Sequence, residues 1–181
     1  NLVCEQLQAV FSNKILCHAC NSAAIERFPQ YHADMVRLGL GLYGISPIDG
    51  RQLAPVATLT TAILQMHDVA ETTTVGYSRR GQLRRVSKIA TLPIGYADGL
   101  NRHLGCGKGF CLVNGQKAPY VGNICMDVCM IDVTDIDCRV GDRVEIFGQH
   151  LPVTKLSQWL DTIPYEILTS VSERVKRLYF E

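Results

Sequence analysis

The chain has 181 residues, 47% of them hydrophobic and 19% charged, so it can bury one ordinary core and part of a second. Its formal charge of +1 gives no general attraction to nucleic acid or to an anionic membrane surface. No apolar run approaches the roughly 20 residues of a membrane-spanning helix, and the eight cysteines are scattered with no signal peptide before them, which indicates reduced thiols in a cytoplasmic protein.

The first part of the chain predicts alternating strands and helices. NLVCEQLQAVF carries no initiating Met and reads like the end of an amphipathic helix, so we expect the chain to belong to something longer. Residues 14–20 form a short apolar run that ends at Asn21 and Ser22, two good N-cap residues, before the helical pattern AAIERF. In residues 34–44 apolar side chains alternate with Arg37 and glycines, which predicts a second strand. Two buried strands with a helix between them make a βαβ unit, as in parallel sheets and barrels.

After Pro47 the pattern changes to short β-rich segments separated by turns. Asn114-Gly115 is a strong hairpin signal. The segments cover residues 55–68, 86–94, 110–113, 119–121, 124–133 and 143–147, and helices are expected at 153–160 and 164–177. This part predicts an antiparallel β domain that closes with two helices.

Tyr96, in the stretch GYADG, stands where a strand must end. A tyrosine in such a place is most often a half-buried packing residue whose hydroxyl reaches water. The flanking glycines remove steric cover, so a backbone partner or a ligand could also approach the phenol closely. The residues alone leave both interpretations open.

The run ICMDVCMIDV, residues 124–133, predicts a buried strand with Met126 on one face and Asp127 on the other. A carboxylate inside such an apolar run is costly unless it is hydrogen-bonded. We therefore expect Asp127 to have a dedicated partner.

CHAC, residues 17–20, matches C-x-x-C and could suggest zinc together with Cys125 and Cys129. Residues i and i+3 of a strand point to opposite faces, and four residues of strand span about 13 Å. The sulfurs of a tetrahedral zinc site lie roughly 4 Å apart. We therefore expect no metal site, and interpret these cysteines as small hydrophobic residues.

The basic run RRGQLRRVSK, residues 79–88, is the one place where nucleic-acid binding could start. No aromatic residue interleaves it, so base stacking has no platform there. A solvated loop between two strands is the preferred interpretation, and no nucleic-acid partner is expected.

Taken in order, HACNSAAIERFP, VRLGLGLYG, LPIGYADG, VGNICMD, TIPYEIL and SERVKR resemble the carboxyl-terminal part of bacterial alanine racemases. The resemblance covers nearly the whole chain. It implies a mainly β (α+β) chain, in which residues 1–48 are the last strands and helices of a (β/α)8 barrel and residues 49–181 are an antiparallel C-terminal β domain. It also implies a homodimer with shared active sites that supplies D-alanine for cell-wall peptidoglycan.

The family uses pyridoxal 5′-phosphate (PLP), and the resemblance assigns four residues to its phosphate: Ser22, Gly39, Leu40 and Tyr165. A helix that opens after a barrel strand attracts a phosphate, and a glycine permits close backbone approach. The resemblance places Arg37 against the pyridine nitrogen. Arginine has only donors and stays protonated, so that nitrogen must remain an unprotonated acceptor.

Racemisation removes a proton from one face of the amino acid and returns one to the other, so it requires two acid–base groups. The resemblance identifies Tyr96 as the group that takes the α-proton of L-alanine in the partner's site. It identifies the Met126 N–H, backed by Asp127, as the contact for the substrate carboxylate. The lysine that binds PLP covalently lies near the family's amino terminus and is not among these residues, so the chain alone is expected to be inactive.

Two positions depart from the family pattern. Asn123 stands where many members carry arginine, and Ser78 replaces a frequent glycine. Two alternatives stay open: a broad-specificity or serine racemase of the same fold, and a noncatalytic β-barrel module that binds nucleic acid.

Overall fold

The computed structural model describes residues 2–180. The chain divides into two compact units, Asn1–Val56 and Ala57–Glu181. None of the helices between residues 2 and 180 has the length and apolar character needed to cross a membrane.

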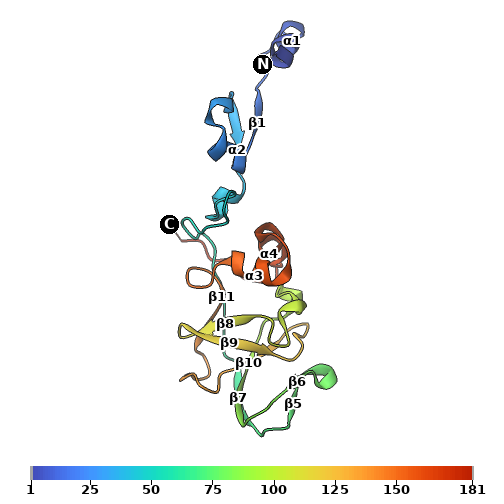
Figure 1. The fold of residues 1–181 in the computed structure, drawn as a ribbon, viewed down its shortest axis with the longest axis vertical. Coiled ribbons are helices and arrows are strands. Elements are labelled where there is room, and N and C mark those ends of the chain that lie inside the picture. Colours follow the sequence, from blue (N-terminus) through green and yellow to red (C-terminus); the bar gives the residue numbers. More distant parts are fainter. Residues whose placement is uncertain (1, 181) are drawn as a thin grey trace. The chain divides into compact units, whose positions relative to one another are not determined.

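The first unit contains a βαβ arrangement, as predicted (Figure 1). Strands β1 (His18–Asn21) and β2 (Met35–Arg37) pair in parallel, and α2 (Ser22–Arg27) connects them. The Asn21 side chain accepts a hydrogen bond from the Ala24 N–H at 3.0 Å and so caps α2. The unit also contains α1 (Leu2–Val10) and the 3₁₀ helices η1 (Pro29–Tyr31) and η2 (Leu40–Tyr43).

The prediction of two buried strands in this unit is wrong in two respects. β2 ends at Arg37, and the glycine-rich part of residues 34–44 forms η2 instead. Gly44, with φ 73°, ends η2 because its N–H can turn back to the carbonyl of Gly41. Cys20 is the one buried residue of β1, because a two-stranded sheet covers little of its own surface.

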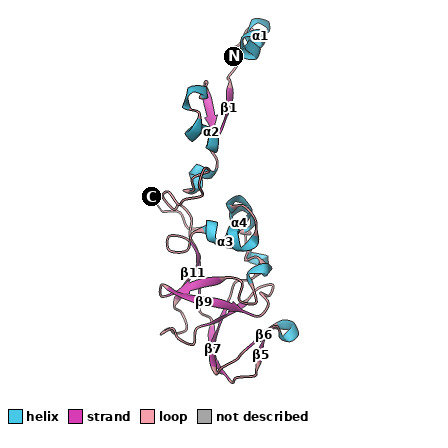
Figure 2. Ribbon diagram, viewed as in Figure 1, coloured by secondary structure: helices cyan, strands magenta, loops and turns pink. Residues whose placement is uncertain are grey.

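The second unit is built on a seven-stranded sheet, which confirms the predicted antiparallel β domain (Figure 2). Its strand order is β3-β11-β8-β9-β10-β7-β4, and each neighbouring pair is antiparallel. The strands are β3 (Leu59–Ala62), β4 (Gln65–Val69), β7 (Ser87–Leu92), β8 (Phe110–Val113), β9 (Gln116–Val121), β10 (Cys129–Asp132) and β11 (Arg143–Phe147). A separate antiparallel pair, β5 (Thr74–Val75) and β6 (Gly81–Gln82), extends from the sheet.

Alternation along the strands builds the core of this unit. Leu92, Tyr120, Ile131 and Val144 are each at most 2% exposed and come from four different strands. Asn114 and Gly115, with φ of 50° and 78°, make the predicted hairpin between β8 and β9.

Three predicted elements differ from the structure. Residues 55–68, expected as one β-rich segment, contain β3 and most of β4, which ends at Val69. A strand was expected over residues 124–133, but strand β10 begins only at Cys129. The residues before it form a bend, which is closed by a hydrogen bond from the Cys125 N–H to the Val128 carbonyl at 2.9 Å. α3 (Val153–Leu160) matches its prediction, whereas α4 (Pro164–Ser170) ends seven residues before position 177.

The end of α4 has a tertiary cause. Val171 leaves the helix in an extended conformation, and the Ser172 N–H then donates to the carbonyl of Asp98 at 3.2 Å. Residues 171–177 therefore run as an irregular strap that lies against the loop after β7. Three further 3₁₀ helices, η3 (Tyr77–Arg79), η4 (Tyr96–Asp98) and η5 (Arg102–Leu104), were not predicted.

Candidate functional site

Tyr96 lies in a tight turn that follows β7. η4 begins at Tyr96, and the buried Asp98 accepts a hydrogen bond from the Gly95 N–H at 2.9 Å through Oδ2. Gly99, with φ 105°, ends the turn. Tyr96 is 44% exposed, so the turn does not bury this residue within the second unit.

A bend that contains Met126 lies directly against this turn. The Tyr96 N–H donates to the carbonyl of Cys125, and the Ala97 N–H donates to the carbonyl of Met126, each at 3.0 Å. A Cβ on Gly95 would lie 2.3 Å from the Met126 carbonyl oxygen, so only glycine fits there. The structure thus brings together Tyr96 and Met126, which lie 30 positions apart in the sequence.

Asp127 does have a dedicated partner, but its predicted burial is wrong. Its carboxylate accepts a hydrogen bond from Arg174 Nη2 at 2.7 Å, while the side chain is 56% exposed. The bend before β10 turns this carboxylate out of the sheet. Arg174 also approaches Asp98, with Nε 3.5 Å from Oδ1.

Arg174 is a residue that the sequence reasoning missed. A single helix over residues 164–177 places it as one of several basic residues near a helix end, and its position in the strap depends on where α4 stops. The sequence did contain a signal for it, since Asp98 and Asp127 both lie in segments singled out for function, and their two carboxylates require a positively charged partner.

The two departures from the family pattern lie close together. Asn123 donates through Nδ2 to the carbonyl of Tyr77 at 3.0 Å, which ties η3 to the segment before the Met126 bend. Ser78 adopts φ 58° and ψ 18°, a left-handed conformation that glycine adopts more readily.

Three of the predicted cofactor residues meet in the first unit. The Ser22 hydroxyl, on a residue 8% exposed, accepts a hydrogen bond from the Gly39 N–H at 2.7 Å. Leu40 follows directly and begins η2. Arg37, at the end of β2, donates through Nη2 to the carbonyl of Ala19 at 2.9 Å, which fixes the direction of its guanidinium.

Tyr165 lies in the first turn of α4, directly after Pro164 at the start of the helix. Its side chain is half-buried, and its carbonyl accepts a hydrogen bond from Thr169 Oγ1 at 2.8 Å. The helix therefore holds the Tyr165 backbone in place.

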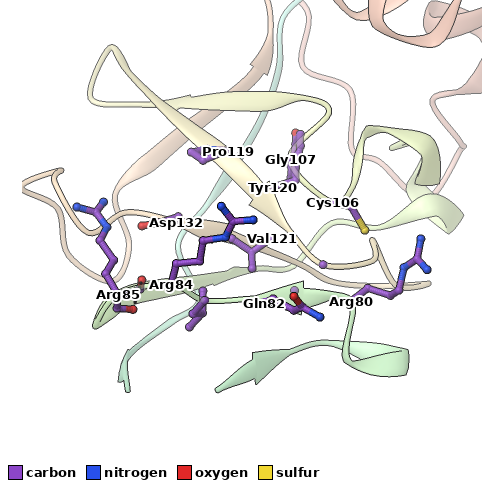
Figure 3. A pocket seen from close by; sticks show the side chains of 14 residues that line it. Arg80, Gln82, Arg84, Arg85, Cys106, Gly107, Pro119, Tyr120, Val121 and Asp132 are labelled. Atoms are coloured by element: carbon purple, nitrogen blue, oxygen red, sulfur yellow. Dashed lines mark hydrogen bonds between the residues drawn. The ribbon is translucent and has the colours of Figure 1, made fainter. Parts of the chain in front are cut away.

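The basic run that was considered for nucleic acid lines a pocket of about 420 Å³ (Figure 3). Figure 3 shows Arg84 lying between Arg85 and Arg80 along one side of it, with the three guanidinium groups spread apart. Arg85 is paired with Asp135, with Nη2 and Oδ2 in direct contact. The basic run begins at the last residue of η3, passes through strand β6 and a loop, and ends in β7, where a solvated loop was expected.

The cysteines are all free thiols. Cys125 precedes β10 and Cys17 precedes β1, so the strand geometry used to argue against zinc does not hold at these two positions. Between residues 2 and 180 no three His, Cys, Asp or Glu side chains are grouped so that they could hold a metal ion. Burial raises the pKa of the Cys111 thiol to about 12 and that of Cys129 well above its ordinary value.

Comparison with protein families gives two adjacent matches. The family described as "Alanine racemase, C-terminal domain" matches residues 56–179, and "Alanine racemase, N-terminal domain" matches residues 1–47. Among curated proteins, the alanine racemase of Halothermothrix orenii is 46% identical over 171 residues, which cover 90% of this chain and 45% of that protein. The alanine racemase of Methanococcus maripaludis is 42% identical over 172 residues, 90% of this chain and 46% of its own length.

Solved structures give the same result. Alanine racemase from Bartonella henselae with covalently bound pyridoxal phosphate has a TM-score of 0.86 and 38% identity, covering 97% of this chain and 50% of that one. An alanine racemase from Clostridium difficile 630 has a TM-score of 0.88 and 34% identity, and the match covers 97% of this chain and 48% of that one. The chain spans about half the length of the curated relatives it matches.

Proposed function

The chain belongs to the alanine racemase family, and from that premise we propose that it forms part of an enzyme that interconverts L-alanine and D-alanine. The observation that carries this proposal is the pair of hydrogen bonds that join the Tyr96 turn to the Met126 bend. They hold the backbone of Tyr96, the residue whose phenol would carry the proton, against the backbone segment that would bind the substrate carboxylate. The D-alanine produced would serve cell-wall peptidoglycan, and the enzyme would act in the cytoplasm.

In this proposal residues 1–48 complete a (β/α)8 barrel and residues 49–181 are the β domain. The parallel pair β1–β2 with α2 across it supports the first assignment, since a barrel of this kind is built from such units. The antiparallel seven-stranded sheet supports the second.

PLP fits the polar groups of the first unit. Ser22 Oγ and the Gly39 N–H lie within 2.7 Å of each other, so one phosphate could contact both, together with the Leu40 backbone. Tyr165 would add its hydroxyl to the phosphate, and Arg37 would donate to the pyridine nitrogen. When bound, PLP supplies an electron sink for the electron pair that remains after the α-proton is removed.

Tyr96 would be the acid–base group on one face of the substrate. Tyr96 is 44% exposed, while its backbone is held by the hydrogen bond to the Cys125 carbonyl. A general base must reach its proton within hydrogen-bond distance, so a rigid turn with a free side chain suits the role. Tyr96 would take the α-proton of L-alanine and return one when D-alanine is converted.

Met126 would bind the substrate carboxylate through its backbone N–H. Met126 is 53% exposed, so the bend that carries this N–H lies at the surface of the β domain. Asp127 would support the contact from the next position. We propose that both residues, like Tyr96, act in the site of a partner subunit in a homodimer.

The test is a hybrid racemase, in which residues 1–181 are joined to the part of the H. orenii alanine racemase that lies outside its match to this chain. We expect the hybrid, with PLP, to racemise alanine in both directions and to prefer alanine over serine in a substrate panel. A soluble hybrid that binds PLP and is inactive would contradict the proposal. Preferential turnover of serine would assign the chain to a different racemase.

The chain of residues 1–181 alone is expected to have no racemase activity, because it does not contain the cofactor-binding lysine that the resemblance implies. Turnover of L-alanine by rigorously purified chain would contradict this expectation. The measurement is circular dichroism or coupled D-alanine detection after incubation with PLP.

A further inference from the structure

One guanidinium contacts carboxylates from two separate segments of the β domain. Arg174 Nη2 donates to Asp127 Oδ1 at 2.7 Å, and Arg174 Nε lies 3.5 Å from Asp98 Oδ1. Asp98 belongs to the Tyr96 turn, and Asp127 belongs to the Met126 bend. The same side chain therefore touches both segments that the proposed function requires.

The other oxygen of Asp98 links this contact to the tyrosine backbone. Asp98 Oδ2 accepts from the Gly95 N–H at 2.9 Å, directly before Tyr96. The Asp98 side chain is 13% exposed, whereas that of Asp127 is 56% exposed. A rotation of the Asp98 carboxylate would alter the start of the Tyr96 turn.

The strap that carries Arg174 is itself held in position. The Ser172 N–H donates to the Asp98 carbonyl at 3.2 Å, and Ser170 Oγ donates to the Gly99 carbonyl at the same distance. Arg177 donates to the carbonyl of Val171 at 2.9 Å and so ties the strap to the end of α4. Arg174 is thus presented from a fixed backbone.

We propose that Arg174 is a positioning residue. Its guanidinium holds the Tyr96 turn and the Met126 bend in a fixed relative position by neutralising the negative charges of Asp98 and Asp127 together. This inference rests on the proposed function of Tyr96 and Met126. Arg174 acts through these two segments and does not itself carry a proton.

The chemistry of arginine suits this arrangement better than that of lysine. A guanidinium offers separate donors in a rigid fork, so Nε and Nη2 can serve two carboxylates at once. Without the cation, Asp98 and Asp127 would be two like charges on adjoining segments, and their repulsion would favour separation of the turn from the bend.

The first test uses the 181-residue chain and needs no cofactor. Arg174→Met removes the guanidinium and keeps an unbranched side chain. Amide hydrogen exchange, followed by nuclear magnetic resonance, should become about tenfold or more faster at Gly95, Tyr96 and Ala97, which is the loss expected for a hydrogen-bonded charge. Exchange in the central strands should stay unchanged.

Lys176→Met is the matched control. Lys176 is exposed, lies in the same strap, and forms neither a hydrogen bond nor an ion pair with the described residues from 2 to 180. It should leave all three amides unchanged. Equal exchange in Arg174→Met and Lys176→Met would overturn the proposal.

Two milder variants keep the proposal testable if Arg174→Met fails to fold. Arg174→Lys should give intermediate exchange at Gly95 and Tyr96, because a single ammonium reaches one carboxylate well. Asp127→Asn should accelerate exchange at Ala97, and adding Arg174→Lys to it should have a smaller effect than in the wild type, since the two residues share one interaction. If the effects of Asp127→Asn and Arg174→Lys on the exchange rates were fully additive, the proposal would be overturned.

Kinetics of the hybrid racemase separate positioning from folding. Arg174→Met should raise KM for alanine and lower kcat, each about tenfold, with partial rescue by Arg174→Lys. If only kcat falls, and it falls in proportion to the folded fraction of the Arg174→Met variant, Arg174 has a structural role alone and the proposal is overturned. If Tyr96→Phe leaves activity intact, the proposed function fails, while the amide exchange still decides whether Arg174 holds the two segments together.

Discussion

The backbone N–H of Tyr96 donates a hydrogen bond to the carbonyl oxygen of Cys125, with nitrogen and oxygen 3.0 Å apart. This contact joins a turn after β7 to the bend before β10, and these strands are themselves antiparallel neighbours in the sheet. The rigid sheet therefore sets the distance between two segments that carry proposed functional groups. Sites built on such elements hold their geometry more closely than sites on free loops.

Gly95→Ala tests how closely the turn and the bend must approach. The new Cβ would lie 2.3 Å from the Met126 carbonyl and 2.4 Å from that of Cys125, so the backbone must move apart. We expect a loss of about 2 kcal/mol or more in the free energy of unfolding, measured by urea denaturation. The hybrid racemase should lose most of its activity.

The control for this prediction is Gly107→Ala. Gly107 has φ 78°, and a Cβ added there would meet no heavy atom within 4 Å, so the substitution causes backbone strain without a collision. Its cost should be about 1 kcal/mol, with activity retained. Equal losses in the two variants would show that close approach at Gly95 is unimportant.

Local signals in the sequence predicted the elements whose causes are local. Asn21 caps α2, and Asn114-Gly115 makes the hairpin, because each residue acts within a few positions of itself. The Met126 bend could not be predicted in this way. Its apolar alternation favours a strand, and it is turned out by hydrogen bonds from Tyr96 and Ala97, some 30 positions away.

The same reasoning explains why Arg174 was missed. Helical periodicity continues past residue 170, whereas the contact of Ser172 with Asp98 ends α4 and sets the direction of the strap. The short β5–β6 pair was missed because two-residue strands carry too little pattern to recognise. The residues of the candidate site were identified by resemblance, and their roles stay predictions.

Glu145 predicts a dependence of stability on pH. Burial alone would raise its pKa, but hydrogen bonds from the His150 ring and from the N–H groups of His150 and Leu151 lower the pKa below its ordinary value. A lowered pKa means that the stabilisation is present above the unfolded pKa of about 4.3 and is lost as the pH falls through the folded value.

Glu145→Gln should therefore cost about 1–2 kcal/mol at pH 7, since it weakens hydrogen bonds to a charged acceptor. The difference from wild type should shrink as the pH falls below about 4. Urea denaturation at both pH values measures this, with exposed Glu173→Gln as the control of equal charge change. A difference that stays constant with pH would contradict the assignment to Glu145.

When the native chain reacts with a disulfide reagent, exposed thiols should react faster than buried ones. Cys106 is exposed and should react in the fast phase. Cys111 and Cys129 are 0% exposed and have raised pKa values, so they should react only as the chain unfolds. Cys106→Ser should remove one equivalent from the fast phase, and Cys111→Ser one from the slow phase; fast labelling of Cys111 would contradict the burial of β8.

If Tyr96 acts in the partner's site, activity should return when two inactive hybrids are mixed. One would carry Tyr96→Phe, and the other would lack the cofactor-binding lysine. A heterodimer of the two contains one doubly defective site and one intact site. Heterodimers verified by mass that remain inactive would show that Tyr96 does not act across the interface.

The most direct test of Tyr96 as the acid–base group is the exchange of the α-proton with solvent deuterium in the Tyr96→Phe hybrid. Phenylalanine keeps the ring and removes the proton carrier, so net racemisation should fall sharply in both directions. Deuterium should still enter D-alanine through the group on the other face, while it enters L-alanine only very slowly. Undiminished exchange into L-alanine would contradict the account and leave Tyr96 as a packing residue.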